Sequence, residues 1–179
     1  MKAIKGSSDA SGLRFGIVVS RFNKFVTSRL LSSAMETLTK AGASEDQIEV
    51  VRVPGAFEIP LVARTMARSG RFDSVLCLGA VIRGDTPHFE YISAEASRGI
   101  AQASLDSDVP VVFGVLTTET VAQAIERADP QKYNRGAEAA KTAIEMANVM
   151  KQLRAGDAAA GVSGRIQPDR KARPRKKPT

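Results

Sequence analysis

The only histidine of this 179-residue chain, His88, follows a segment whose residue types suit acid–base chemistry beside an anion. Gly84 permits close backbone approach to a ligand. The amides of Asp85 and Thr86 stand just before a predicted helix start, where backbone N–H groups and the helix dipole attract anions. An imidazole in the first helical turn can move protons near neutral pH, because its reference pKa is about 6.5. The spacing alone leaves an alternative open, in which Thr86 caps the helix and His88 is a surface residue.

The sequence lacks the common motifs for nucleotides and catalytic zinc. No Gly-Lys-Ser/Thr follows the glycine of this segment, and no strand–helix turn carries the G-x-G-x-x-G pattern of dinucleotide-binding proteins. A zinc hydrolase usually needs more than one histidine. A phosphate-binding P-loop, a dinucleotide site and zinc hydrolysis are therefore not expected.

Two further loops carry an aromatic side chain beside a polar one. Phe22 and Asn23 follow the first predicted strand, and Phe57 and Glu58 stand in a rigid turn between Pro54 and Pro60. Phe22 suits stacking on a flat heterocycle in a pocket, or it is a core residue or a hydrophobic staple at the start of the next helix. Glu58 suits binding to the hydroxyl groups of a polyol. Alternatively, it is a first-turn carboxylate that faces the dipole of the next helix.

Phe113 and Arg127 extend the set of candidates toward the C-terminus. A core position is the simpler reading for Phe113, which stands in an apolar run. Arg127 ends a short predicted helix, where a cation complements the helix dipole. Its alternative role is phosphate binding, because a guanidinium matches the geometry of phosphate oxygens.

Short apolar runs alternate with segments of helical periodicity, which predicts the elements that position these residues. The predicted strands span residues 14–20, 49–53, 74–82 and 110–116, and the helices span about 26–41, 59–69, 89–103, 121–128 and 134–154. Runs that are apolar throughout are typical of parallel strands with both faces covered. We therefore expect an α/β fold of the flavodoxin-like kind, a three-layer α/β/α sandwich around a four-stranded parallel sheet. Ligands of such sheets bind beyond the carboxyl ends of the strands, where the loops described above meet.

Charge and composition limit the class of protein. The net charge is +7, but residues 165–179 alone contribute +6, which leaves +1 for residues 1–164. We expect a flexible segment over 1–12, one domain over 13–154 and a disordered basic tail over 155–179. The tail favours solubility over nucleic-acid binding. No apolar run is long enough to span a bilayer, no signal peptide is apparent, and the lone Cys77 suits a buried, inert thiol in the cytoplasm.

Taken together, several segments resemble, in order and spacing, the motifs of the lumazine synthase family of riboflavin biosynthesis. The resemblance covers roughly residues 12–153. It rests on the segments 20–23, 54–60, 79–91, 113–118, 123–127 and 134–136.

The resemblance implies a cofactor-free condensation of 5-amino-6-(ribitylamino)pyrimidine-2,4-dione with 3,4-dihydroxy-2-butanone 4-phosphate. The products are 6,7-dimethyl-8-ribityllumazine, phosphate and water. His88 would shuttle protons. The implied substrate-binding residues are Phe22, Asn23, Ala56, Phe57, Glu58, Val81, Ile82, Gly84, Asp85, Thr86, Phe113, Arg127 and Arg135. Among these, Phe22 would stack on the pyrimidine, and Arg127 would join Gly84, Asp85 and Thr86 at the phosphate.

The resemblance also implies a homopentamer in which Phe113, Arg127 and Arg135 serve the site of the adjacent chain. In some members twelve pentamers form an icosahedral shell, and both assemblies stay open here. Riboflavin synthase, which consumes the product, is a further candidate partner. The chain departs from the family at Arg135, where lysine is expected, at Asp129–Tyr133 and in the basic tail. Alternatives to an active enzyme are a non-catalytic flavin- or pyrimidine-binding relative and a nucleic-acid-binding protein acting through its tail.

Overall fold

A four-stranded parallel sheet forms the middle layer of the computed structural model, which describes residues 3–159. The strands are β1 (Phe15–Ser20), β2 (Ile48–Val53), β3 (Ser74–Ile82) and β4 (Val111–Thr118). Their order is β2-β1-β3-β4, with every neighbouring pair parallel. This is the order of a flavodoxin-like sheet. The predicted fold class and strand number are confirmed.

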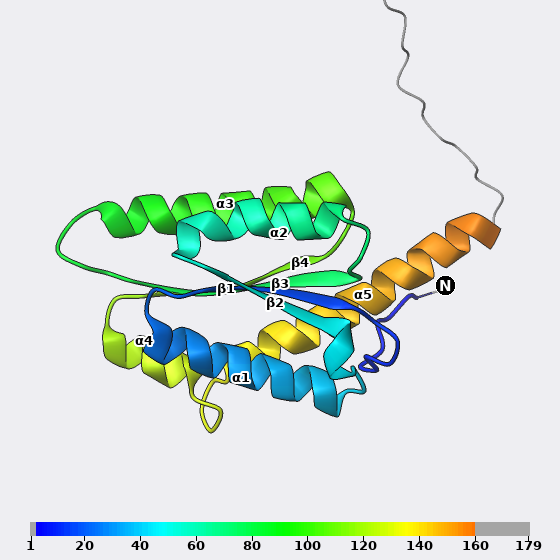
Figure 1. Ribbon diagram of the computed structural model, residues 1–179, viewed down its shortest axis with the longest axis horizontal. Coiled ribbons are helices and arrows are strands. Elements are labelled where there is room, and N and C mark those ends of the chain that lie inside the picture. Colours follow the sequence, from blue (N-terminus) through cyan, green and yellow to red (C-terminus); the bar gives the residue numbers. More distant parts are fainter. Residues whose placement is uncertain (1–2, 160–179) are drawn as a thin grey trace, which may run out of the picture.

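Helices cover both faces of the sheet (Figure 1). On one face lie α1 (Lys24–Lys40), α4 (Val121–Ala128) and α5 (Arg135–Ala159), and on the other lie α2 (Ile59–Arg68) and α3 (His88–Ser107). Two short 3₁₀ turns, η1 (Glu45–Gln47) and η2 (Ala56–Glu58), precede β2 and α2. The helical periodicity in the sequence predicts all five helices, whereas turns of three residues are too short to show a period.

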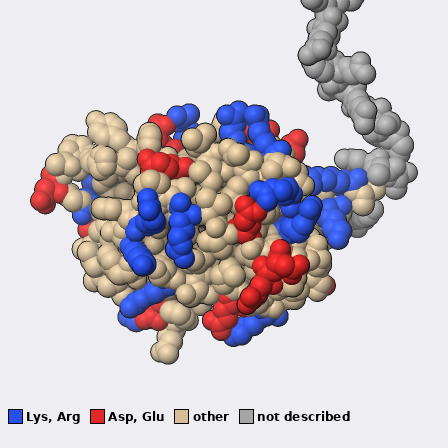
Figure 2. Space-filling view, viewed as in Figure 1, with Lys and Arg blue, Asp and Glu red and all other residues tan. Residues whose placement is uncertain are grey.

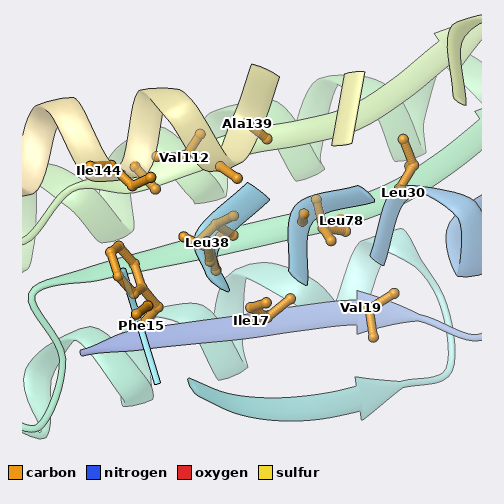
Figure 3. Packing of buried hydrophobic residues seen from close by; sticks show 14 of the residues in the cluster. Phe15, Ile17, Val19, Leu30, Leu38, Leu78, Val112, Ala139 and Ile144 are labelled. Carbon is orange, nitrogen blue, oxygen red and sulfur yellow. The ribbon is translucent and has the colours of Figure 1, made fainter. Parts of the chain in front are cut away.

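The alternation of side chains along the strands divides the apolar core into two layers. Phe15 and Ile17 of β1 pack with Leu38 of α1 and Ile144 of α5, as Figure 3 shows. Val18, which points to the opposite face, packs with residues of α2 and α3. Burial raises the pKa of the Cys77 thiol far above its usual range, and the predicted burial of this cysteine is confirmed.

The two outer strands are less buried than the two central ones. β1 is buried along its whole length, and β3 is buried up to the partly exposed Ile82. β2 exposes Val50 and Arg52, and β4 exposes Phe113 and Thr117. Coverage of both faces therefore holds for the centre of the sheet only, because β2 and β4 are its edges.

Contacts near the N-terminus tie residues 5–10 to the domain, although the sequence predicts a flexible segment over 1–12. The Ala10 N–H donates to the Ala41 carbonyl over 2.8 Å, and Ala10 is fully buried. The Asn148 side-chain amide donates to the carbonyls of Ser7 and Asp9, at 3.1 and 2.9 Å. The acceptors in these contacts are backbone carbonyls, which every residue carries. The pattern of side chains in the sequence therefore cannot predict them.

At the other end, α5 continues to Ala159, five residues past the predicted domain boundary. Residues 155–159 of the predicted tail thus belong to a helix, and residues 160–179 lie outside the described part. Within residues 3–159 no helix is both long and apolar enough to cross a membrane. On the face in Figure 2, basic and acidic side chains are interspersed, with basic groups more frequent toward the end of α5. This pattern agrees with the small net charge of the domain.

Candidate active site

A cleft of about 680 Å³ opens where β1, β2 and β3 reach their carboxyl ends. We call it the His88 cleft. It is lined by Phe22, Pro54, Gly55, Ala56, Phe57, Glu58, Ala80, Val81, Ile82, Gly84, His88, Phe89 and Ile92. Eight of the predicted site residues are among them. The cleft lies where ligands bind to open parallel sheets.

Two aromatic rings stand exposed beside this cleft. Phe22 has 71% of its surface accessible and Phe57 has 56%. Two exposed aromatic rings that border one cleft can form a contact surface for a ligand. The alternative of a core position for Phe22 is therefore wrong.

Backbone hydrogen bonds hold the Phe22 turn against the end of β2. The Arg21 and Phe22 N–H groups donate to the carbonyls of Val53 and Pro54, at 2.8 and 3.0 Å. Asn23 adopts left-handed backbone angles with φ of 55°, a region that asparagine enters more readily than most residues. Its side-chain amide donates to the Ala80 carbonyl over 2.9 Å. Asn23 thus connects the turn to β3 and does not line the cleft itself.

Glu58 closes the turn that carries Phe57. Its Oε2 accepts a hydrogen bond from the Gly55 N–H at 2.9 Å. The carboxylate therefore satisfies a backbone donor at the start of η2, in partial agreement with its alternative as a helix-end carboxylate. Its Oε1 makes no hydrogen bond to the other described residues, and Glu58 is one of the residues that line the cleft. One carboxylate oxygen is thus placed to accept from a ligand hydroxyl.

The segment from Gly84 to His88 forms the rim of the cleft at the start of α3. His88 is the first residue of α3, and Pro87 occupies the N-cap position without a side-chain capping bond. Thr86 therefore does not cap the helix, whereas His88 is exposed, as the same alternative expects. Asp85 and Thr86 are exposed next to the cleft without lining it. Because side chains leave this helix start uncapped, its backbone N–H groups are available to an anion.

The other three predicted residues lie in a different cleft, at the β4 edge of the sheet. This cleft of about 540 Å³, the β4 cleft, is lined by Val112, Phe113, Gly114, Val115, Leu116, Thr117, Arg127, Arg135, Glu138, Ala139 and Thr142. It shares no lining residue with the His88 cleft. Phe113 is 45% exposed there, so its alternative as a core residue is wrong.

Two arginines of the β4 cleft, Arg127 and Arg135, lie near the ring of Tyr133, which does not itself line the cleft. The Arg127 and Arg135 guanidinium carbons lie 5.7 and 5.8 Å from the centroid of the Tyr133 ring. Arg135 Nη1 also pairs with Glu138 Oε2 at 2.5 Å. The arrangement presents two cations beside an exposed aromatic ring, which suits an anionic or planar ligand group.

Sequence reasoning missed Arg83, which precedes Gly84 and contacts two glutamates and the Phe89 ring. The position of Arg83 directly before Gly84, in a segment already identified as a candidate site, was the one sign of its role in the sequence. It also overlooked Ala80, Phe89 and Ile92 of the cleft wall, because apolar residues of a strand or helix give no sign of facing a cleft.

Comparison with known protein families identifies the chain. A family model described as 6,7-dimethyl-8-ribityllumazine synthase matches residues 12–151. The match takes in every element from β1 through most of α5 and all residues that line the two clefts. The chain belongs to the 6,7-dimethyl-8-ribityllumazine synthase family.

Proposed function

We propose that this chain is an active lumazine synthase, a transferase that condenses 5-amino-6-(ribitylamino)pyrimidine-2,4-dione with 3,4-dihydroxy-2-butanone 4-phosphate. The products are 6,7-dimethyl-8-ribityllumazine, phosphate and water. The observation that carries the proposal is the His88 cleft. There an exposed aromatic ring, a carboxylate with one free oxygen and the only histidine border one space. Membership of the family supports the same reaction.

The pyrimidine and its sugar-like chain would occupy the inner part of the His88 cleft. Phe22 would stack on the ring, and Val81 and Ile82 would line its pocket. Glu58, with the backbone around Ala56 and Phe57, would bind the ribityl hydroxyls. The amide of Asn23 is engaged by Ala80, so Asn23 would reach the substrate through its Oδ1 or act by holding the Phe22 turn.

The phosphate would bind at the start of α3, where Gly84, Asp85 and Thr86 present backbone N–H groups. The amine of the pyrimidine attacks the ketone, and loss of water gives an imine. Phosphate is then eliminated, and a second condensation closes the ring with loss of another water. His88 would accept and return protons in these steps, as a general acid–base group at the edge of the cleft.

The β4 cleft would complete the site of an adjacent chain. Phe113, Arg127 and Arg135 line a cleft at the β4 edge of the sheet, which has no lining residue in common with the His88 cleft. A head-to-tail ring would bring the β4 cleft of one copy to the His88 cleft of the next. We propose a homopentamer of this kind, with Arg127 at the phosphate of the neighbouring site.

The test is a fluorescence assay for the lumazine product. Purified protein is mixed with both substrates, and product and free phosphate are followed together. We expect both to appear in equal amounts, at a rate proportional to protein and above that of the protein-free mixture. Binding of the pyrimidine without turnover would instead favour the non-catalytic relative.

A further inference from the structure

Arg83 joins the first turn of α3 to the end of β4, in addition to the packing of Phe89 and Ile92 against the apolar core. The residues between Arg83 and His88 are all exposed, and no side chain caps the helix. Their side chains make no hydrogen bonds or ion pairs with other described residues. What holds this rim in place must therefore come from its ends.

Arg83 contacts the end of β4, the loop directly after it and the first turn of α3. Its backbone N–H donates to the Thr118 carbonyl at the end of β4 over 2.9 Å. Its Nε donates to Glu119 Oε2 at 2.5 Å, and its Nη1 pairs with Glu90 Oε1 in the first turn of α3. The guanidinium carbon also lies 4.3 Å from the centroid of the Phe89 ring, within the range of a cation–π contact. A planar, forked cation can make these contacts together, whereas an ammonium group cannot.

These contacts bracket His88 closely. Phe89 and Glu90 are the two residues that follow it, and both are held by Arg83. Fixing the ring of Phe89 and the carboxylate of Glu90 restricts the rotation and tilt of the helix start. His88, on the same turn, is thereby held at the edge of the cleft.

The charge balance argues against direct phosphate binding by Arg83. Its guanidinium already faces two carboxylates, which raise the pKa of Arg83, and the Arg83 contact lowers the pKa of Glu90. One cation with two anions carries no excess positive charge for a ligand phosphate. The cluster is therefore suited to holding structure and not to binding an anion.

We propose that Arg83 is a positioning residue, which sets the place of His88 and of the 84–87 rim through Glu119, Glu90 and the Phe89 ring. Its effect on turnover rests on the proposed function. Its effect on the rim does not.

The test compares Arg83→Met with Arg71→Met. Arg71 has the same kinds of contact, with Glu49 and with the Phe72 ring at 4.7 Å, but lies in the loop before β3, at the amino end of the sheet. In Arg83→Met we expect kcat to fall about 10- to 100-fold, the range for a misplaced catalytic group. KM for the phosphate substrate should rise as well, because the displaced 84–87 rim would bind the phosphate, whereas KM for the pyrimidine should stay near the wild-type value. Arg71→Met should keep all three constants, and Arg83→Lys should restore little of kcat.

A second measurement does not depend on activity. Because the chain has one histidine, its imidazole NMR signals belong to His88 without ambiguity. Arg83→Met should shift these signals and speed amide exchange over residues 86–92, while Arg71→Met leaves both unchanged. Should Arg83→Met fail to fold, a second variant is Glu119→Gln, which removes only the ion pair of Arg83 with the loop after β4. It should give a smaller change of the same kind.

The outcomes separate the two proposals. A raised KM for the phosphate substrate with unchanged kcat would show Arg83 to be a phosphate ligand and overturn the positioning role. Unchanged His88 signals and exchange rates would overturn it as well. If the wild-type protein forms no lumazine, the proposed function fails, and the NMR and exchange measurements still decide the role of Arg83.

Discussion

The two clefts of this chain are built in different ways. The His88 cleft is made largely of loop segments and element ends, and its turns are held by backbone hydrogen bonds such as that of Phe22 with Pro54. The β4 cleft is made of the faces of β4, α4 and α5, and its polar groups are long side chains. The first therefore offers a preformed shape, and the second offers charge. Under the proposed function, each supplies what the other lacks.

The largest effect is expected from changing the His88 cleft at its only histidine. In His88→Ala, kcat should fall about 100-fold, at the lower end of the usual range for general acid–base help, because amine–ketone condensation proceeds partly without a base. KM should change little, since Phe22 and Glu58 remain in place. Kinetics of lumazine formation give both constants. The matched control, Gln102→Ala, changes the same helix away from the cleft, and an unchanged kcat in His88→Ala would remove His88 from the mechanism.

Mixing variants of the two clefts tests whether they work together across chains. A His88→Ala chain keeps its β4 cleft, and an Arg127→Ser chain keeps its His88 cleft. In randomly mixed head-to-tail rings about a quarter of the interfaces join two intact halves. Co-refolding the two impaired variants should therefore recover up to about a quarter of the wild-type activity.

The recovery has to be compared with each variant refolded alone and with assemblies shown to contain both chains. Absence of recovery in confirmed mixed assemblies would place the roles of His88 and Arg127 within one chain. The shared site would then be abandoned, while the assignment of His88 would stand.

The two clefts also differ in how far the sequence could predict them. The loops of the His88 cleft follow strands whose apolar runs are unmistakable, and parallel strands place their carboxyl ends at one edge. Phe22, Glu58 and His88 could therefore be brought together from the sequence. For Phe113 and Arg127 the residue pattern alone favoured core packing and helix capping. Their cleft depends on β4 being an edge strand, which the order of the strands decides and their periodicity does not.

Long-range polar contacts were equally beyond the sequence. Arg83 and Glu119 are 36 residues apart in the chain, so nothing local signals their ion pair. The attachment of residues 5–10 depends on Asn148 and Gln152 of α5, at even larger separations. Such contacts follow from the fold, whereas helices and strands follow from local periodicity.

A pair of glycine substitutions should separate the clefts by stability. A Cβ added at Gly114 of the β4 cleft would lie 2.7 Å from Leu78 Cδ2 and 2.9 Å from the Cys77 carbonyl oxygen. A Cβ at Gly84 of the His88 cleft would meet no atom within 4 Å. Gly114→Ala should therefore lower the free energy of unfolding by about 1–3 kcal/mol, as overpacking does, and Gly84→Ala should leave it nearly unchanged.

Denaturant unfolding at equal protein concentration measures both variants, since association would change the apparent stability. Gly84→Ala should instead affect function, because a methyl group at the rim obstructs close approach of the phosphate, and KM for that substrate should rise. Equal stability of the two variants would mean that Leu78 and the Cys77 carbonyl move aside for the added methyl group at little cost in free energy.

The smallest effect concerns how the charges of the β4 cleft are held. The centroid of the Tyr133 ring lies 5.7 Å from the Arg127 guanidinium carbon and 5.8 Å from that of Arg135, and exposed cation–π contacts contribute about 0.5–1 kcal/mol. Losing that amount of binding energy in Tyr133→Leu should raise KM for the substrates by about two- to fivefold. The control is Lys132→Gln, which changes a residue next to Tyr133 and removes its ion pair with Glu126 of α4. This variant should leave KM unchanged.

A double-mutant cycle with Arg135→Lys then tests the pairing itself. An ammonium stacks less well on an aromatic face than a guanidinium, so Arg135→Lys should weaken binding when Tyr133 is present. In the Tyr133→Leu background the same change should have little further effect, because the contact has already been lost. Effects that simply add would mean that Tyr133 and Arg135 act independently. The Tyr133 ring would then not contribute to the position of the Arg135 guanidinium. The ion pair of Arg135 with Glu138 would have to set that position instead.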